Sequence, residues 1–407
     1  MADLPTIEAS APPRTGWRTA RRALLAFPTA LILLAIVLLV TAQVVRDRTT
    51  WLALLMYLPL WPPALAAVAW DLLRLGKALP VRFLLSCIGL ATGLLAVGMM
   101  WSPALPPEDL PDATELRILH WNTQWGGRRA QQTLDAMVNE MARRRPDILC
   151  LSEAPAPAWM LFTWSQRAGH GSTWHHAAVA NERAQDYWYR MMVLSRFPVR
   201  LIEQRPLPYG HAALFEVDLL EPAGDNPSAS GPSTGEDGQP HASAPVPTGA
   251  TRILRILMID VQSHVLHPRS PALRAAAEIV ESHARAGRPI DVIAGDCNAP
   301  ARFLGFDALA SAGEGYRRAA FWSGQWRATW PVSIQLGRWQ LRHAWRLSTL
   351  DIDHLLLRRG LRIADAAIFQ NDASDHRGQI VAIRLKSPRG GGVLRKSEPV
   401  RLFPEAR

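Results

Sequence analysis

Cysteine and lysine are scarce in this chain of 407 residues. Its three cysteines cannot form a disulfide framework, and none of them stands in a Cys-x-x-Cys pair. Cys87 lies in a long apolar run, while Cys150 and Cys297 lie in strand-like stretches, so we interpret all three as small packing residues. Only 3 of the 45 basic residues are lysines, which we attribute to coding bias.

A charge excess is also missing from most of the chain, although its net charge is +10. Residues 1–101 hold 9 Lys and Arg against 4 Asp and Glu, and residues 386–407 hold 6 against 2. The region between them is therefore balanced, with 30 basic and 29 acidic residues. This balance argues against a strongly basic groove for long nucleic acid, although it does not exclude a local basic patch.

Long uncharged runs are concentrated in the first hundred residues. Leu24 to Val45 is long enough, at about 1.5 Å per residue, to cross a hydrocarbon core of roughly 30 Å. Trp51 to Trp70 is a second candidate, which Pro62-Pro63 would kink, and Phe83 to Trp101 is a third. A cleaved signal peptide is the alternative for the first run, but that run exceeds the usual apolar core of about 7 to 15 residues.

Basic residues set the orientation that we expect for these runs. Arginines precede the first run, the loop after the second is basic, and acidic residues follow Trp101. We therefore predict an N-terminal α-helical transmembrane region, residues 1–101, in the inner (cytoplasmic) membrane, multi-pass, with the rest of the chain on the extracytoplasmic side. If the second run fails to cross, the rest returns to the cytoplasm. The expected partner is the lipid bilayer, and no obligate protein partner is evident.

After a proline-rich linker, residues 102–114, short apolar strands and helices succeed one another. Strands are predicted at 117–122, 147–153, 190–195, 212–220, 253–261, 352–357 and 379–385, and helices at 130–144 and 272–286. Residues 221–250 lack apolar periodicity and are predicted to be a disordered insertion between two paired strands, and 386–407 a basic tail. Many strands lack the helix that a parallel crossover needs, which predicts a mixed α/β sandwich.

The most informative stretch is Asp291-Val-Ile-Ala-Gly-Asp-Cys-Asn-Ala-Pro300. In an extended chain Asp296 and Asn298 point to one face and Cys297 to the other. A carboxylate beside a carboxamide can orient a water molecule and a phosphoryl oxygen together. Taken alone, however, such a pair is more typical of a turn or a helix cap.

Further polar residues recur at the ends of predicted strands: Asn122, Glu153, His264, Asp353-His354 and Ser374-Asp375-His376. Their order and spacing resemble the endonuclease/exonuclease/phosphatase superfamily of DNase I-like phosphoesterases, over about residues 115–385. The most specific motifs are Gly295-Asp-x-Asn298, Ile352-Asp-His354 and Ser374-Asp-His376. With its leader and the Thr329-Trp-Pro331 segment, the chain is similar to a bacterial membrane-anchored branch of that superfamily.

The resemblance implies an α/β (α+β) four-layer sandwich, with two mixed β-sheets flanked by helices, and a role for each motif residue. Glu153 is expected to bind a divalent metal, with Asn122 in support and Asp375 beside the metal. Asp296 would activate the attacking water and Asn298 would hold it. The remaining roles are stabilisation of the transition state by His376, orientation of His376 by Asp353, and contact with a phosphate oxygen by His264 or, in its place, His267.

Oxygen ligands suit Mg²⁺ or Mn²⁺, and zinc is disfavoured because no Cys/His cluster has its spacing. Cys297 replaces a residue that is commonly bulky and apolar in the family, which changes little. We expect His354 to be a packing residue because it alternates with Asp353. The substrate-binding position is unclear, with Asn181, Tyr187, Tyr189 and Arg190 as unranked candidates.

We therefore predict a membrane-anchored, divalent-metal-dependent phosphoesterase acting on phosphodiester or phosphomonoester bonds. Nucleic acid and phospholipid both stay open as substrates: tethering to the bilayer keeps a lipid substrate possible but does not decide between the two. The competing class is a membrane protein that keeps the fold as a catalytically silent binding module.

Overall fold

The structure is a computed structural model that describes residues 14–73, 83–101, 103–110, 113–124, 130–156, 174–180, 188–219, 252–264, 266–330, 333–336, 339–342, 350–371 and 373–386. The predicted insertion at 221–250 and nearly all of the predicted tail lie outside these residues. The chain forms two compact units, the first comprising residues 1–45 and 58–98 and the second residues 46–57 and 99–407.

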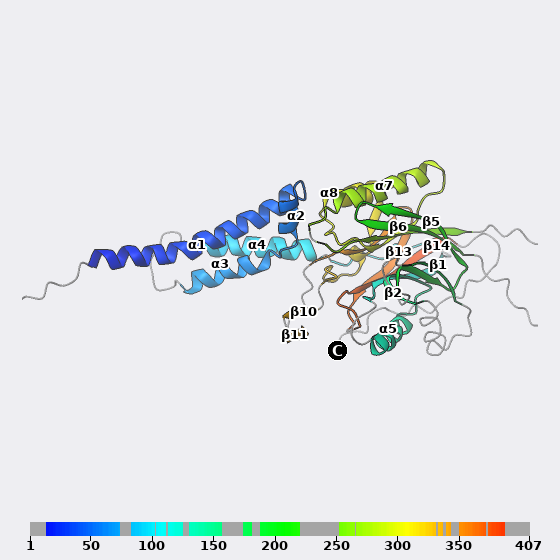
Figure 1. The fold of residues 1–407 in the computed structure, drawn as a ribbon, viewed down its shortest axis with the longest axis horizontal. Helices are drawn as coiled ribbons and strands as arrows, with labels where there is room; N and C mark the ends of the chain where they lie inside the picture. The colour runs from blue at the N-terminus through cyan, green and yellow to red at the C-terminus, as the bar shows by residue number, and fades with distance from the viewer. Residues whose placement is uncertain are drawn as a thin grey trace, which may run out of the picture. The chain divides into compact units, whose positions relative to one another are not determined.

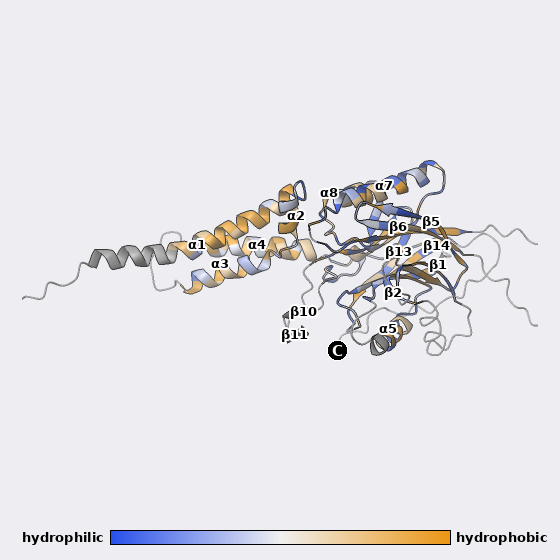
Figure 2. Ribbon diagram, viewed as in Figure 1, coloured by the Kyte–Doolittle hydropathy of each residue, from blue (hydrophilic) through white to orange (hydrophobic). Residues whose placement is uncertain are grey.

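The first unit is built from apolar helices (Figures 1 and 2). They are α1 (Arg14–Val45), α3 (Trp61–Leu73) and most of α4 (Leu84–Met100). Ala26–Val45 is long and apolar enough to cross a membrane. A bent pair of helices is a second candidate, while Leu84–Met100 is shorter than a usual span.

The run at Trp51 to Trp70 is divided between α2 (Thr50–Met56) and α3, which are bent by 67°. The break lies before Pro62 and Pro63, which occupy the first turn of α3. Proline is favoured there because the first amides of a helix have no intrahelical acceptor. The two prolines therefore begin a helix, whereas the sequence had suggested a kink within one.

The second unit contains two six-stranded sheets flanked by helices (Figure 1). The first sheet has the order β13-β14-β1-β2-β4-β3, with bounds Arg362–Phe369, Gly378–Lys386, Ala113–Asn122, Ile148–Pro155, Trp188–Ser195 and His175–Ala180. The second has the order β5-β6-β7-β8-β12-β9, with bounds Val199–Leu207, Gly210–Asp218, Ile253–Val261, Val292–Asp296, Asp353–Arg358 and Tyr316–Arg318. Both sheets are mixed, as predicted.

The remaining elements cover the sheets or connect their strands. Helix α5 (Ala130–Arg144) joins the parallel strands β1 and β2, and α7 (Ser270–Arg285) joins the parallel strands β7 and β8. The short helices α8 (Leu304–Ser311) and η1 (Ala319–Trp322) and the hairpin β10 (Ser333–Leu336) with β11 (Trp339–Arg342) complete the unit. Each sheet therefore has one parallel pair of strands. The carboxyl ends of the two strands in a pair lie at the same edge of their sheet.

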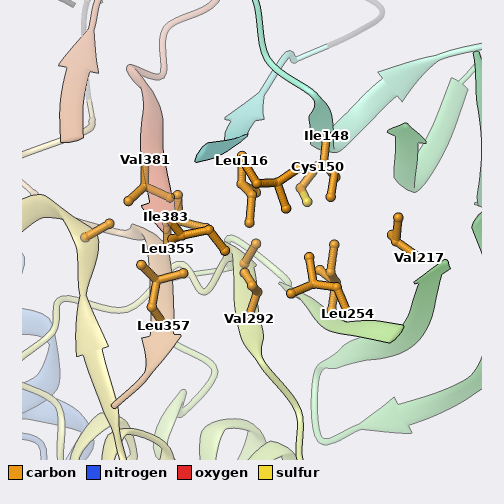
Figure 3. Packing of buried hydrophobic residues seen from close by; sticks show 14 of the residues in the cluster. Leu116, Ile148, Cys150, Val217, Leu254, Val292, Leu355, Leu357, Val381 and Ile383 are labelled. Carbon is orange, nitrogen blue, oxygen red and sulfur yellow. The ribbon is translucent and has the colours of Figure 1, made fainter. Parts of the chain in front are cut away.

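The main core lies between the two sheets (Figure 3). Alternate residues of β1, such as Leu116 and Ile118, meet alternate residues of the second sheet, such as Val292 and Leu355. The opposite face of the first sheet packs on α5 through a separate cluster that includes Trp121. Two-residue periodicity therefore decides which β1 side chains lie between the sheets.

The predicted linker is bonded to the second unit at Glu108. Its backbone amide donates to the carbonyl of Ile363 (2.8 Å), and its carboxylate accepts from the Ile363 amide (3.0 Å) and from Arg317. These bonds hold the chain between α4 and β1 against β13.

Gly295 lets β8 approach β7 closely. Its φ is 156°, and a Cβ at this position would lie 1.9 Å from the carbonyl oxygen of Ile259. A side chain would therefore push apart two parallel strands immediately before Asp296.

We expect Gly295→Ala to lower the free energy of unfolding by about 3 kcal/mol, because the added methyl overlaps the backbone of β7. Thermal unfolding of the full chain in detergent would measure the change. Gly360→Ala is the control, since its Cβ meets only the Arg358 guanidinium at 3.9 Å. Equal melting temperatures for the two variants would contradict this role of Gly295.

Candidate active site

Four buried polar side chains continue the inter-sheet face of the core at one edge. Asn122, Asp260, Asp296 and Asp353 each follow the alternation of core residues in their own strands, β1, β7, β8 and β12. Asp296 is aligned with Asp260 on one side and with Asp353 on the other. The carboxyl ends of both parallel pairs therefore bring polar groups to the same edge.

Hydrogen bonds between the sheets join these groups. Asn122 Nδ2 of the first sheet donates to Asp296 Oδ2 of the second (2.9 Å). Gln379 Nε2 of β14 donates to the backbone oxygen of Asp353 (2.6 Å). The polar edge therefore binds the two sheets together at the point where the apolar core ends.

The loop bearing His376 is fixed to the end of β1. Ser374 Oγ donates to the carbonyl of Asn122 (2.8 Å) and accepts from the His376 amide (3.0 Å). The indole of Trp121 donates to the His376 carbonyl (3.0 Å). These three bonds hold the imidazole at the edge of the first sheet.

His376 and Asp353 form a buried ion pair across the sheets, with His376 Nδ1 and Asp353 Oδ2 2.8 Å apart. Burial alone would lower the pKa of His376, but the Asp353 carboxylate raises it to about 10. Burial would likewise raise the pKa of Asp353, but the facing imidazolium makes the net shift downward. The imidazole is therefore protonated at neutral pH and the carboxylate ionised.

Thr329 fixes the backbone at Asp353, because its hydroxyl oxygen accepts from the amides of Ile352 (3.2 Å) and Asp353 (3.1 Å). The second carboxylate oxygen of Asp353 is buried without a hydrogen-bond partner among the described residues. This oxygen adds negative potential beside Asp296.

Asp296 is a strong candidate for a base. Its Oδ1 accepts from the Asn298 amide (2.9 Å) and its Oδ2 from Asn122. Burial and the charge of Asp353 raise its pKa well above the usual value for an aspartate. A carboxyl group with a raised pKa can take a proton from water and release it again near neutral pH.

Glu153 reaches this edge because its backbone departs from the strand. By alternation it would point toward α5 with Leu149 and Leu151, but its φ is 47°. Its Oε1 lies 3.4 Å from Asn122 Nδ2, and burial raises the pKa of its carboxyl group. Left-handed backbone at a non-glycine residue is costly and is typical of functional sites.

Asn298 also has a left-handed backbone, with φ of 45°. The strand ends at Asp296, so the extended geometry expected from the sequence does not reach this residue. Its side-chain Nδ2 donates to the carbonyl of Val261 (2.7 Å), which attaches the turn to the end of β7. Cys297 between the two is buried, as are His354 and its partner Phe306.

Asp375 lies beside His376, with its Oδ1 3.7 Å from His376 Nε2. Trp330 Nε1 donates to its other oxygen (3.1 Å). Oδ1 itself is buried and has no hydrogen-bond partner among the described residues. Trp330 was noted in the sequence only as part of the Thr329-Trp-Pro331 segment, and its hydrogen bond to Asp375 was not predicted.

Arg190 and Asp260 form a second ion pair between the sheets (2.7 Å). Burial raises the pKa of Asp260 to about 6, against the opposing effect of Arg190. Arg190 was one of four unranked candidates, of which Asn181 and Tyr187 lie outside the described residues. Asp260 was not predicted. It stands two residues after Met258 in β7, on the same face of the strand as the core residues, and this position could have indicated it.

His264 lies on the loop after β7 and is exposed. Its ring is 4.5 Å from the ring of His267, which stacks on Tyr209 at 4.3 Å. The structure thus places the two histidines side by side, His264 exposed and His267 half-buried, and gives no preference between them as a phosphate contact.

Asp296, Asp353 and His376 form a group that could hold a metal ion, since one ligand atom of each lies within 4.8 Å of the others. Two of these groups, however, are already bonded to each other, since His376 Nδ1 lies 2.8 Å from Asp353 Oδ2. A ring nitrogen that donates a hydrogen bond is not at the same time a metal ligand.

A family model for the Endonuclease/Exonuclease/phosphatase family matches residues 119–376, more than half of the chain. The chain belongs to this family. It is therefore a phosphoesterase by family, and the matched region contains all eight of the predicted site residues. A comparison with curated proteins finds no match.

Several solved structures are similar. The zebrafish (D. rerio) TDP2 complex with single-stranded DNA product shares 13% identity, covering 66% of this chain and 99% of the other, with a TM-score of 0.43. The human Nocturnin catalytic domain shares 14%, covering 66% and 93%, with a TM-score of 0.44. A mannosyl-6-phosphatase of Bacteroides thetaiotaomicron shares 10%, covering 66% and 99%, with a TM-score of 0.44.

The Asp353–His376 pair predicts a pH-dependent stability. The folded pKa of His376, about 10, lies above its ordinary 6.5, so this stabilisation is complete below pH 6.5 and is lost as the pH rises toward 10. We expect the melting temperature of the wild type to fall over this interval by several degrees more than that of Asp353→Asn. Parallel curves of melting temperature against pH would contradict the raised pKa.

Proposed function

We propose that this chain is a membrane-anchored, divalent-metal-dependent hydrolase of phosphate esters. The observation that carries the proposal is the hydrogen-bonded set of Asn122, Asp296, Asp353 and His376 across two sheets. A carboxyl group with a raised pKa and a protonated imidazole, within a few ångströms of each other, are the base and the acid that such a hydrolysis needs.

In the proposed step, Asp296 removes a proton from water as the water oxygen bonds to phosphorus. The bond between phosphorus and the leaving oxygen breaks, and His376 gives its proton to that oxygen. The proton gained by Asp296 balances the one lost by His376, and the products are a phosphate and an alcohol. Asp353 keeps the imidazolium in place before the transfer.

Glu153, Asn122 and Asp375 are the residues that we propose to hold Mg²⁺ or Mn²⁺. The buried Glu153 carboxyl has a raised pKa, and Asp375 has a buried oxygen without a hydrogen-bond partner among the described residues. A buried carboxylate oxygen without a hydrogen-bond partner, such as Asp375 Oδ1, fits a hard cation with oxygen ligands. When bound, the cation would stabilise negative charge on the phosphoryl oxygens.

The membrane anchor is supported by the exposed side chains of the first unit. Large apolar residues point outward on all three of its helices, among them Phe27, Leu65 and Leu94. Such a surface is unfavourable in water. With the basic residues on the flanks, we propose insertion in the inner membrane with the catalytic unit outside the cytoplasm.

We expect the full chain in detergent to hydrolyse bis-p-nitrophenyl phosphate with Mg²⁺ or Mn²⁺ and to lose this activity in EDTA. Asp296→Asn should lower kcat by about 10²- to 10⁴-fold, because it removes the base. The matched control is Asp291→Asn, at the other end of β8, whose carboxylate pairs with Arg358. Equal loss in both variants would contradict the assignment of Asp296.

Metal binding can be measured without turnover. Mn²⁺ should raise the melting temperature of the wild type, since a ligand that binds only the folded state stabilises it. Glu153→Gln should abolish this rise. Glu140→Gln should keep it, since Glu140 pairs with Arg143 and Arg144 on α5. An unchanged rise in Glu153→Gln would place the metal elsewhere.

A further inference from the structure

The segment Arg46–Tyr57, which connects two apolar helices, belongs to the same compact unit as the candidate active site. It lies outside the matched family region, which begins at residue 119. We call it the connecting segment. Its contacts are with residues 297–305, which comprise the loop after β8 and the start of α8 and which we call the β8 loop, and with the neighbouring Ser270 and Asp307.

Tyr57 donates a hydrogen bond from its hydroxyl to the backbone oxygen of Asn298 (2.7 Å). Arg269 Nε donates to the same oxygen (3.1 Å). The Tyr57 ring also packs edge-on against Phe303, with centroids 5.6 Å apart. One side chain of the connecting segment therefore contacts both halves of the β8 loop.

Arg46 and Asp47 bind the rest of the β8 loop. Arg46 donates to the carbonyl of Phe303 (2.7 Å) and forms an ion pair with Asp307. Asp47 accepts from the Leu304 amide (2.7 Å) and from the Ser270 hydroxyl. Phe303 is the N-cap of α8 and its side chain gives no cap bond, so Asp47 supplies the acceptor that the helix start needs.

The bond from Tyr57 meets the backbone at a strained position. Asn298 has φ of 45°, and its amide bonds to the Asp296 carboxylate. Asparagine adopts left-handed backbone more readily than most residues, but the conformation still depends on the bonds that its peptide groups make. The hydroxyl of Tyr57 and the guanidinium of Arg269 both bond the carbonyl oxygen of this residue, while its amide bonds the Asp296 carboxylate.

We propose that Tyr57 is a positioning residue for the hydrolysis, which acts through the Asn298 backbone to orient the Asp296 carboxylate. This inference rests on the proposed function. The connecting segment thereby makes the geometry of the active site depend on the N-terminal region of the chain.

The test uses the full chain in detergent with Mn²⁺ and bis-p-nitrophenyl phosphate. Tyr57→Phe should lower kcat about tenfold and leave KM within twofold, since small misplacements of a reacting group have effects of this order or larger. Tyr316→Phe is the matched control: it too removes a tyrosine hydroxyl that donates to a backbone carbonyl, that of Ile290 (2.8 Å), at the far end of β8. Its kcat should be unchanged.

A double-variant comparison separates positioning from general loss of stability. In an Asn298→Ala background, Tyr57→Phe should lower kcat less than twofold further, because both changes act on the same turn. A full tenfold loss in that background, an unchanged kcat in Tyr57→Phe alone, or equal losses in Tyr57→Phe and Tyr316→Phe would each overturn the proposal.

Amide hydrogen exchange separates this inference from the proposed function. Tyr57→Phe should speed exchange in residues 297–305, and Tyr316→Phe should leave it unchanged. If the wild type shows no metal-dependent turnover, the proposed function fails. Exchange still decides whether Tyr57 holds the β8 loop, and unchanged rates in Tyr57→Phe would overturn that contact.

Discussion

The buried ion pair between Asp353 and His376 is the interaction on which the rest of the site depends. Removing two charges from water is unfavourable unless they are paired and further hydrogen-bonded. Here Thr329 and Gln379 bond the backbone of Asp353, and Trp121 and Ser374 bond that of His376. Because the partners come from different sheets, the charge pair requires that the sandwich be closed.

The need to pair buried charges across the two sheets also explains why the polar groups collect at a single edge. Each parallel pair, β1 with β2 and β7 with β8, ends at this edge, and each contributes one residue that departs from regular backbone. Glu153 turns out of the alternation of β2, and Asn298 turns directly after β8. Backbone strain thus places a carboxylate and an amide where ideal strands would not put them.

Much of the fold and of the site was predictable because strong apolar periodicity marks the strands that build them. Strand β7 and helix α5 have the predicted limits, and Asn122, Asp296, Asp353 and His376 do come together. The four edge strands of the two sheets, β13, β3, β5 and β9, were all missed. Alanine and histidine in β3, charged residues in β5 and alanines in β13 hide the two-residue pattern that buried strands show.

Contacts between distant parts of the sequence could not be predicted. The ion pair of Arg190 with Asp260 and the bond of Trp330 to Asp375 depend on how the sheets face each other, and no local pattern carries that information. Helix α8 was missed for a related reason. The acceptor at its start is Asp47, more than 250 residues earlier, so no capping residue stands before it in the sequence.

The connecting segment has a practical consequence for work on this family domain by itself. A soluble fragment that starts at the family limit, residue 119, or at the linker would lack Tyr57, Asp47 and Arg46. It would keep every residue that the family motifs contain while losing the contacts that these three residues make with the loop that follows Asp296. For this chain, the boundary of sequence similarity is therefore narrower than the boundary of the structure that supports the chemistry.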